Sequence, residues 1–88
     1  MNYEADRKLA TERGITFYVS SKEGQGKPWT LVQDGIEDLH DAMILVNHLK
    51  GSPEYGIFAI NNGGGYLYWT SRSPDLLNST VIEMKLSS

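Results

Sequence analysis

The sequence has no cysteine and no long apolar run. Without cysteine there are no disulfides, no thiolate nucleophile and no cysteine-based zinc site. The longest apolar run, residues 42–46, is much shorter than a membrane span or the apolar core of a secretion signal, and the first residues are charged. These absences predict a cytoplasmic protein without a membrane partner.

Basic charge is also scarce over most of the chain. Residues 1–27 hold five Lys or Arg and four Asp or Glu, a balance of +1, whereas residues 28–88 hold three and seven, a balance of −4. The whole chain therefore has a net charge of −3. Because phosphate backbones are bound by basic surfaces, direct binding of nucleic acid is not expected.

The length bounds what the chain has room for. With 88 residues, of which 40% are hydrophobic, a single domain over residues 1–88 with one core is expected. A domain of this size uses most of its apolar side chains for packing. We therefore expect function to reside on the surface.

A helix is predicted near the N-terminus. Residues 3–13 are rich in Ala, Leu, Glu, Lys and Arg, and Asn2 and Gly14 are suited to cap its two ends. Its apolar face is thin. This N-terminal segment, residues 1–14, is therefore expected to dock loosely on the domain or on a partner.

The strongest helical pattern lies in the middle of the chain. Asp34 and Glu37 have the spacing of a capping box, and Gly51 ends the run. The apolar positions that recur at helical spacing are Ile36, Leu39, Ala42, Met43, Val46 and Leu49. We expect this face to pack on a sheet, which leaves Ile44 as an apolar residue on the opposite side.

Strands are predicted from alternating, β-branched and aromatic stretches. Residues 15–20 and 28–33 form a first hairpin, residues 55–61 and 66–71 form a second around a glycine-rich turn, and residues 80–86 close the sheet. The predicted order is α-β-β-α-β-β-β. The fold class is therefore α+β, an antiparallel sheet of about five strands packed against one main helix, with an additional N-terminal helix.

Both faces of the second hairpin are apolar, which a sheet covered on one side would not need. The second face is therefore either covered or left for a partner. Four tyrosines are predicted on the sheet face opposite the core: Tyr18, Tyr55, Tyr66 and Tyr68. Exposed tyrosine favours protein interfaces, whereas the alternative is that the N-terminal helix covers these rings or that they pair across strands.

Acidic residues gather where the central helix is predicted to begin: Asp34, Glu37, Asp38 and Asp41. Capping and the helix dipole favour acids at such a position. The alternative is an acidic patch that engages a basic groove on a partner. Together with Ile44 and the four tyrosines, these acids make up the predicted partner-binding surface.

Patterns for catalysis, cofactors or metals are weak. Residues 24–27 have the glycines and lysine of a phosphate loop, but they lack its spacing and the helix that follows it. His40 and His48 lie about 12 Å apart along a helix, too far to share a metal. No catalytic residue, cofactor or metal is expected, and a small enzyme or ligand-binding domain that uses His40 or residues 24–27 is the less favoured alternative.

The run Gly51-Ser52-Pro53-Glu54-Tyr55 leads out of the central helix. With a hairpin before that helix and a closing antiparallel sheet after it, the chain resembles the small phage-encoded proteins that include anti-CRISPR inhibitors. The resemblance implies a non-enzymatic inhibitor in the host cytoplasm that binds a host defence nuclease or surveillance complex and blocks DNA binding or nuclease recruitment. The alternative is a homodimeric structural or accessory protein, built through an open sheet edge or the tyrosine face.

Overall fold

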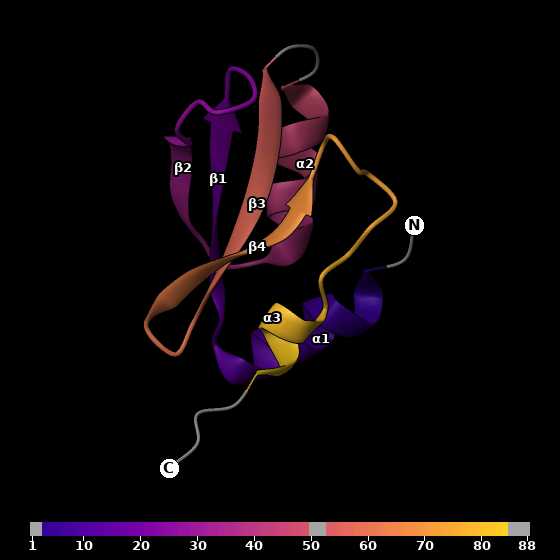
Figure 1. Cartoon of the computed structure of the whole chain (residues 1–88). Helices are drawn as coiled ribbons and strands as arrows, with labels where there is room; N and C mark the ends of the chain where they lie inside the picture. Colours follow the sequence, from indigo (N-terminus) through magenta and orange to yellow (C-terminus); the bar gives the residue numbers. More distant parts are fainter. Residues whose placement is uncertain (1–2, 50–52, 85–88) are drawn as a thin grey trace.

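A four-stranded antiparallel sheet forms the centre of the molecule (Figure 1). The computed structural model describes residues 3–49 and 53–84. Its elements are α1 (Glu4–Arg13), β1 (Thr16–Lys22), β2 (Thr30–Ile36), α2 (Leu39–His48), β3 (Glu54–Asn61), β4 (Gly64–Thr70) and α3 (Thr80–Glu83). The strands lie in the order β2-β1-β3-β4. The α+β class is confirmed, with four strands in place of the five expected.

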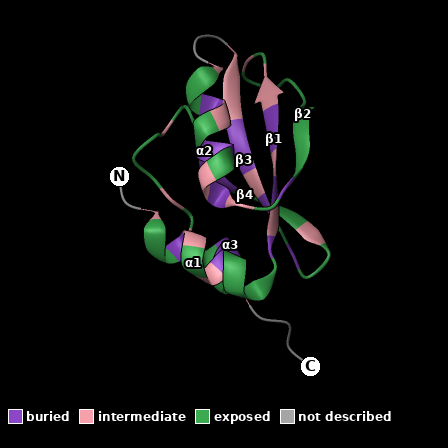
Figure 2. Ribbon diagram, turned by 180° about the vertical axis from the view of Figure 1, so that it is seen from behind, coloured by how far each residue is buried: buried purple, intermediate pink, exposed green. Residues whose placement is uncertain are grey.

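The core lies on one face of this sheet, under α2 (Figures 1 and 2). The residues that α2 buries there are Leu39, Ala42, Met43 and Val46, as the helical spacing predicts. The first strand contributes the residues that alternation predicts, Ile15, Phe17 and Val19, all of them buried. Among the described helices, none covers the opposite face of β1, β2 and β3, which is turned toward the viewer in Figure 1.

The central helix begins later than the sequence pattern indicates. Strand β2 continues to Ile36, which pairs with Phe17, so Asp34 belongs to a strand and the predicted capping box is wrong. Asp38 is the N-cap of α2, and its carboxylate accepts a hydrogen bond from the backbone N–H of His40 at 3.0 Å. Gly51, the predicted end of this helix, lies outside the described residues.

The N-terminal helix is present where it was predicted. Gly14 follows it in the left-handed conformation, with φ 68°, which confirms the predicted C-cap. Asn2, the predicted N-cap, lies outside the described residues. Figure 1 shows α1 and α3 side by side at one end of the sheet, where Ala10 of α1 is buried.

The last element is a short helix, so the strand predicted over residues 80–86 is wrong. Val81 and Ile82 are both buried, although neighbouring residues of a strand point to opposite faces. Two side chains fix this turn by donating to its carbonyls: Asn61 Nδ2 to Val81 at 2.9 Å, and Arg13 Nη1 to Ile82 at 2.9 Å. Lys85 and Leu86, the end of the predicted strand, lie outside the described residues.

The second hairpin turns at Asn62 and Gly63, which have φ of 55° and 82°, the positive angles that a tight turn of this kind requires. Its register shifts once, between Ile57 and Phe58 of β3. Such a bulge changes which way the following side chains point. Tyr68 and Trp69 are consequently both buried, although they are neighbours in β4.

Candidate functional site

The uncovered face of the sheet carries an apolar and aromatic surface, which we call the outer-face cluster. Its members come from all four strands and the loop before β2: Tyr18, Trp29, Leu31, Phe58, Ile60 and Leu67. The rings of Tyr18 and Phe58 are stacked, with centroids 4.9 Å apart and an interplanar angle of 1°. Trp29 meets Phe58 edge-on at 5.2 Å. These contacts fix three aromatic rings in one layer.

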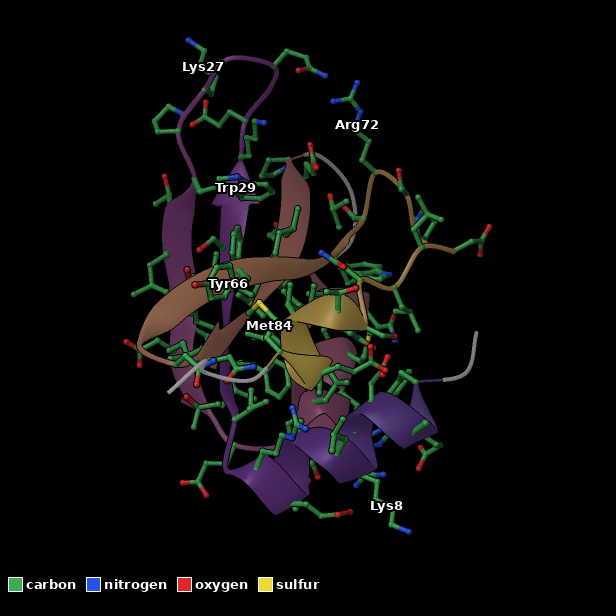
Figure 3. All side chains as sticks on the ribbon, turned by 60° about the horizontal axis from the view of Figure 1, so that its bottom comes forward. Lys8, Lys27, Trp29, Tyr66, Arg72 and Met84 are labelled. Carbon is green, nitrogen blue, oxygen red and sulfur yellow. The ribbon has the colours of Figure 1, made fainter. Side chains whose placement is uncertain are left out.

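Two glycines let the rings lie close to the backbone. A Cβ at Gly56 of β3 would lie 3.0 Å from the Trp29 ring, and one at Gly65 of β4 would lie 2.5 Å from the Tyr18 hydroxyl. The Tyr18 side chain therefore extends from β1 across the sheet to β4. Figure 3 shows Trp29 next to the strands, while Lys27 of the neighbouring loop points away from the sheet. Backbone sites without side chains thus shape this surface.

A shallow groove of about 500 Å³ runs over the cluster. The residues that line it are Tyr18, Ser20, Trp29, Leu31, Asp34, Phe58 and Ile60. Asp34 is the only ionisable acid or base in this lining apart from the Tyr18 phenol. Outside the groove, the ammonium of Lys22 lies 5.3 Å from the centroid of the Trp29 ring, a cation–π contact.

Much of the cluster is open to solvent. Leu31 is 56% exposed, and Ile60 and Leu67 are also among the exposed large apolar residues of the described chain. Single exposed apolar residues are ordinary, whereas contiguous ones around a groove mark interaction sites. The chemistry available here is burial of apolar and aromatic surface beside one carboxylate.

The four tyrosines do not share one face. Tyr18 lies in the outer-face cluster, whereas Tyr68 is in the core, with 1% of its surface exposed, so its predicted place on the face opposite the core is wrong. Burial, together with the hydrogen bond to Asp6, raises the pKa of Tyr68 well above its ordinary value. Tyr55 packs against the core at its margin, and Tyr66 is exposed on β4 (Figure 3). Tyr55 pairs in register with Ser21, three residues from Tyr18, so Tyr18 and Tyr55 point to opposite faces of the sheet.

The four predicted acids are also dispersed. Asp38 forms a bidentate pair with Arg7, whose Nε and Nη2 donate to its carboxylate at 2.8 and 2.9 Å. Asp34 lines the outer-face groove, while Glu37 and Asp41 line a different depression between β2 and α2. They therefore do not form the single acidic patch that was the alternative to capping, while Asp38 does cap α2.

Ile44, the remaining predicted contact residue, is exposed on α2, as its helical position predicts. It belongs to the face of α2 that points away from the sheet, so it does not join the outer-face cluster. A partner that covers the cluster would therefore not reach Ile44 through the same surface.

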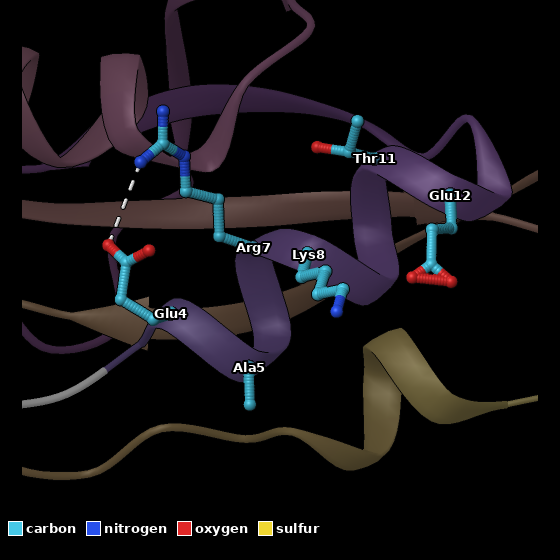
Figure 4. Close-up of a pocket in the computed structure, with 6 residues that line it drawn as sticks. All are labelled: Glu4, Ala5, Arg7, Lys8, Thr11 and Glu12. Carbon is cyan, nitrogen blue, oxygen red and sulfur yellow. Dashed lines mark ion pairs between the residues drawn. The ribbon is translucent and has the colours of Figure 1, made fainter.

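A larger depression, of about 720 Å³, follows the outside of α1 (Figure 4). All of its lining residues belong to that one helix: Glu4, Ala5, Arg7, Lys8, Thr11 and Glu12. Figure 4 shows that these side chains point in different directions, with one ion pair of 3.6 Å between Arg7 and Glu4. Since the polar groups do not converge on a common point, we do not regard this depression as a site.

The two histidines and residues 24–27, which were considered for an enzyme or a ligand-binding domain, do not form a recognisable site. The Tyr3 hydroxyl and Nδ1 of His40 are hydrogen-bonded at 2.7 Å, and His48 is exposed at the end of α2. Residues 24–27 lie in the loop between β1 and β2, and no helix follows them. Within residues 3–49 and 53–84, no three His, Asp or Glu side chains are grouped as metal ligands. Over the same residues, no helix has the length and apolarity to cross a bilayer.

Sequence reasoning missed most of the outer-face cluster: Trp29, Leu31, Phe58, Ile60 and Leu67. The available signal was the apolarity of both faces of the second hairpin. Assigning the faces required the pairing of Tyr18 with Phe58, which depends on the strand order and on the position of the bulge.

Comparison with models of protein families, with curated proteins and with solved structures gives no significant match.

Proposed function

We propose that this protein is a non-enzymatic protein-binding module that acts in the cytoplasm and binds its partner through the outer-face cluster. The observation that carries this proposal is the contiguous exposed apolar groove on the sheet face without a covering helix. A fixed layer of aromatic rings loses little entropy on binding, which suits a contact surface.

Within this class, the more specific proposal is an inhibitor of a host defence nuclease or surveillance complex, of the anti-CRISPR type. Support for it comes from the resemblance of the sequence to such phage-encoded proteins. An acidic protein with an apolar contact face is suited to cover a basic, nucleic-acid-binding surface of such a complex.

The test uses two matched leucines. Leu31 is 56% exposed in the cluster, and Leu76 is 69% exposed in the loop after β4. The variants Leu31→Glu and Leu76→Glu place the same charge at a similarly exposed position. A partner recovered from the source cells is purified, and its direct binding to each variant is measured by calorimetry.

We expect Leu31→Glu to weaken binding at least about tenfold, because a charge in an apolar contact loses more than about 1.4 kcal/mol. Leu76→Glu is expected to bind like the unchanged chain. Circular dichroism of both variants checks that they fold. Equal binding by the two variants, or equal loss, refutes the outer-face cluster as the contact surface.

A homodimer through a sheet edge is the second candidate. The edge of β4 is partly covered, because Asn78 donates its backbone N–H to the Tyr68 carbonyl at 2.9 Å, whereas β2 pairs only with β1 and exposes Leu31 and Val32. Two register shifts in the pairing of β1 with β2 disfavour further regular pairing along that edge. Sedimentation at several concentrations would reveal such a dimer as a doubled mass.

A further inference from the structure

We propose that the groove of the outer-face cluster binds an arginine side chain of the partner, and that Asp34 holds its guanidinium. In the partner, apolar residues lie on either side of this arginine. This inference rests on the proposed function and adds the chemistry of the partner. It follows from the charge and the lining of the groove.

The lining of the groove has one acidic residue and no basic residue. Asp34 contributes the only carboxylate of its lining. In the described part of the chain, the ion pairs are those of Arg7 with Glu4 and with Asp38, so Asp34 takes part in neither. Lys22 pairs in register with Glu54 and lies over Trp29, so the lysine nearest the cluster already has neighbours of its own. A partner cation is therefore the complement that the groove lacks.

The lining selects among cations. Six of its seven residues are Tyr18, Ser20, Trp29, Leu31, Phe58 and Ile60, a largely apolar and aromatic surface that favours a weakly hydrated, planar cation over a strongly hydrated one. A guanidinium is more weakly hydrated, stacks on aromatic rings and forms two parallel hydrogen bonds to a carboxylate. Arginine therefore satisfies both the rings and Asp34, while lysine satisfies mainly the charge.

The second feature of the partner follows from the flanks of the groove. Exposed Leu31 and Ile60 border it, and exposed Leu67 lies next to the Trp29 ring over Gly56. Apolar residues next to the arginine would cover these side chains. The fitting segment is thus an arginine between apolar residues, presented in an extended or loop conformation.

The test is an NMR titration of the isotope-labelled chain with capped peptides Gly-Leu-Arg-Leu-Gly and Gly-Leu-Lys-Leu-Gly. The arginine peptide is expected to shift the Trp29 indole N–H and the amide of Asp34, and to bind several-fold more tightly than the lysine peptide. Asp34→Asn is expected to weaken arginine-peptide binding by up to about fivefold, as for an exposed charge pair. Asp41→Asn, an exposed acid outside the groove, is the matched control and should change nothing.

Equal binding of the two peptides, absence of shifts at Trp29 and Asp34, or equal effects of the two Asp→Asn variants each overturn the inference. A mass that rises with concentration, with shifts at the same residues, assigns the groove to a second copy of this chain and also overturns it. The proposed function fails separately, when Leu31→Glu and Leu76→Glu bind a purified partner alike.

Discussion

Asp38 has two roles at the start of α2. Its carboxylate accepts from the backbone N–H of His40, as an N-cap, and it pairs with Arg7 of α1. The bond from Arg7 and the bond from His40 hold the pKa of Asp38 below its ordinary value of 3.8. The folded state therefore prefers the charged carboxylate, and Asp38 stabilises the protein above pH 3.8.

This contribution predicts a pH dependence of stability. Because the folded pKa is lowered, the stabilisation is complete above the unfolded pKa and is lost as the pH falls through the folded one. The Asp38 side chain is 35% exposed, so we expect an effect below about 1 kcal/mol. Asp38→Asn, which retains a capping side chain, should be less stable than the unchanged chain at pH 7, and the gap should close below the folded pKa.

Urea denaturation over a series of pH values measures this gap. Asp41→Asn is the control, because Asp41 is exposed and forms no ion pair with any of the residues that the structure describes. A constant gap across the acid range would show that the ion pair with Arg7 adds nothing to the cap.

At this scale, residue type alone was a poor guide to location. Tyr18 and Tyr68 are both strand tyrosines, yet one lies on the outer face and the other in the core. The acidic residue Asp6 lies in the first turn of α1, but its hydrogen-bond partners lie far away in the sequence. The positions of these residues depend on contacts between distant parts of the chain, which a local sequence pattern does not predict.

Among the elements, α3 shows how a side chain fixes a helical turn. The amide of Asn61 donates to the Val81 carbonyl, and this residue of β3 is buried. Removal of the amide would leave a buried carbonyl without its donor. A buried acceptor that loses its partner costs about 1–3 kcal/mol.

We therefore predict that Asn61→Ala lowers the free energy of unfolding by about 1–3 kcal/mol and speeds hydrogen exchange at the amides of residues 81–84. Asn47→Ala on the exposed side of α2 is the control, and it should have no such effect. Unchanged exchange in α3 would show that Arg13 and the buried apolar side chains suffice to hold it.

Elements with a long pattern and a local end signal could be predicted from sequence: α1 with Gly14, the second hairpin with Asn62 and Gly63, and the apolar face of α2. The predictions were wrong where one sequence pattern fits both a strand and a helix. The residues around Val81 suit a strand or a short helix, and those around Ile36 suit a strand end or a helix start. In both cases tertiary contacts made the choice.

At the scale of the whole molecule, Asp6 joins three elements. One of its carboxylate oxygens accepts from the Tyr68 hydroxyl of β4 and from the hydroxyl of Ser79, the N-cap of α3, at 2.7 Å each. A buried carboxylate is stable only when such donors are present. Docking of α1 is therefore linked to the sheet and to α3 through one side chain.

This link predicts that Tyr68→Phe destabilises the protein by about 1–3 kcal/mol, because Asp6 loses a donor without a change in packing volume. The control is Tyr66→Phe, which removes a hydroxyl from an exposed tyrosine of the same strand and should cost little. Thermal unfolding of both variants measures the difference. Equal melting temperatures would mean that solvent replaces the Tyr68 hydroxyl at Asp6.

The predicted second apolar surface could be inferred from the sequence as a whole, because the second hairpin had more apolar residues than one core face needs. The residues that make up this surface could not be inferred in the same way. Phe58 and Tyr18 meet only because β3 lies beside β1 in the strand order, and Trp29 reaches the cluster from a loop without regular structure.

The hydrogen bonds of Asp6 join residues that are synthesised at different times. Its donors lie 62 and 73 residues further along the chain. At about 5–20 residues per second, Asp6 is synthesised about 3 to 12 seconds before Tyr68, and longer before Ser79. Until both donors have been made, α1 lacks the hydrogen bonds that Asp6 forms with the rest of the fold, so this helix is synthesised well before the contacts that secure it.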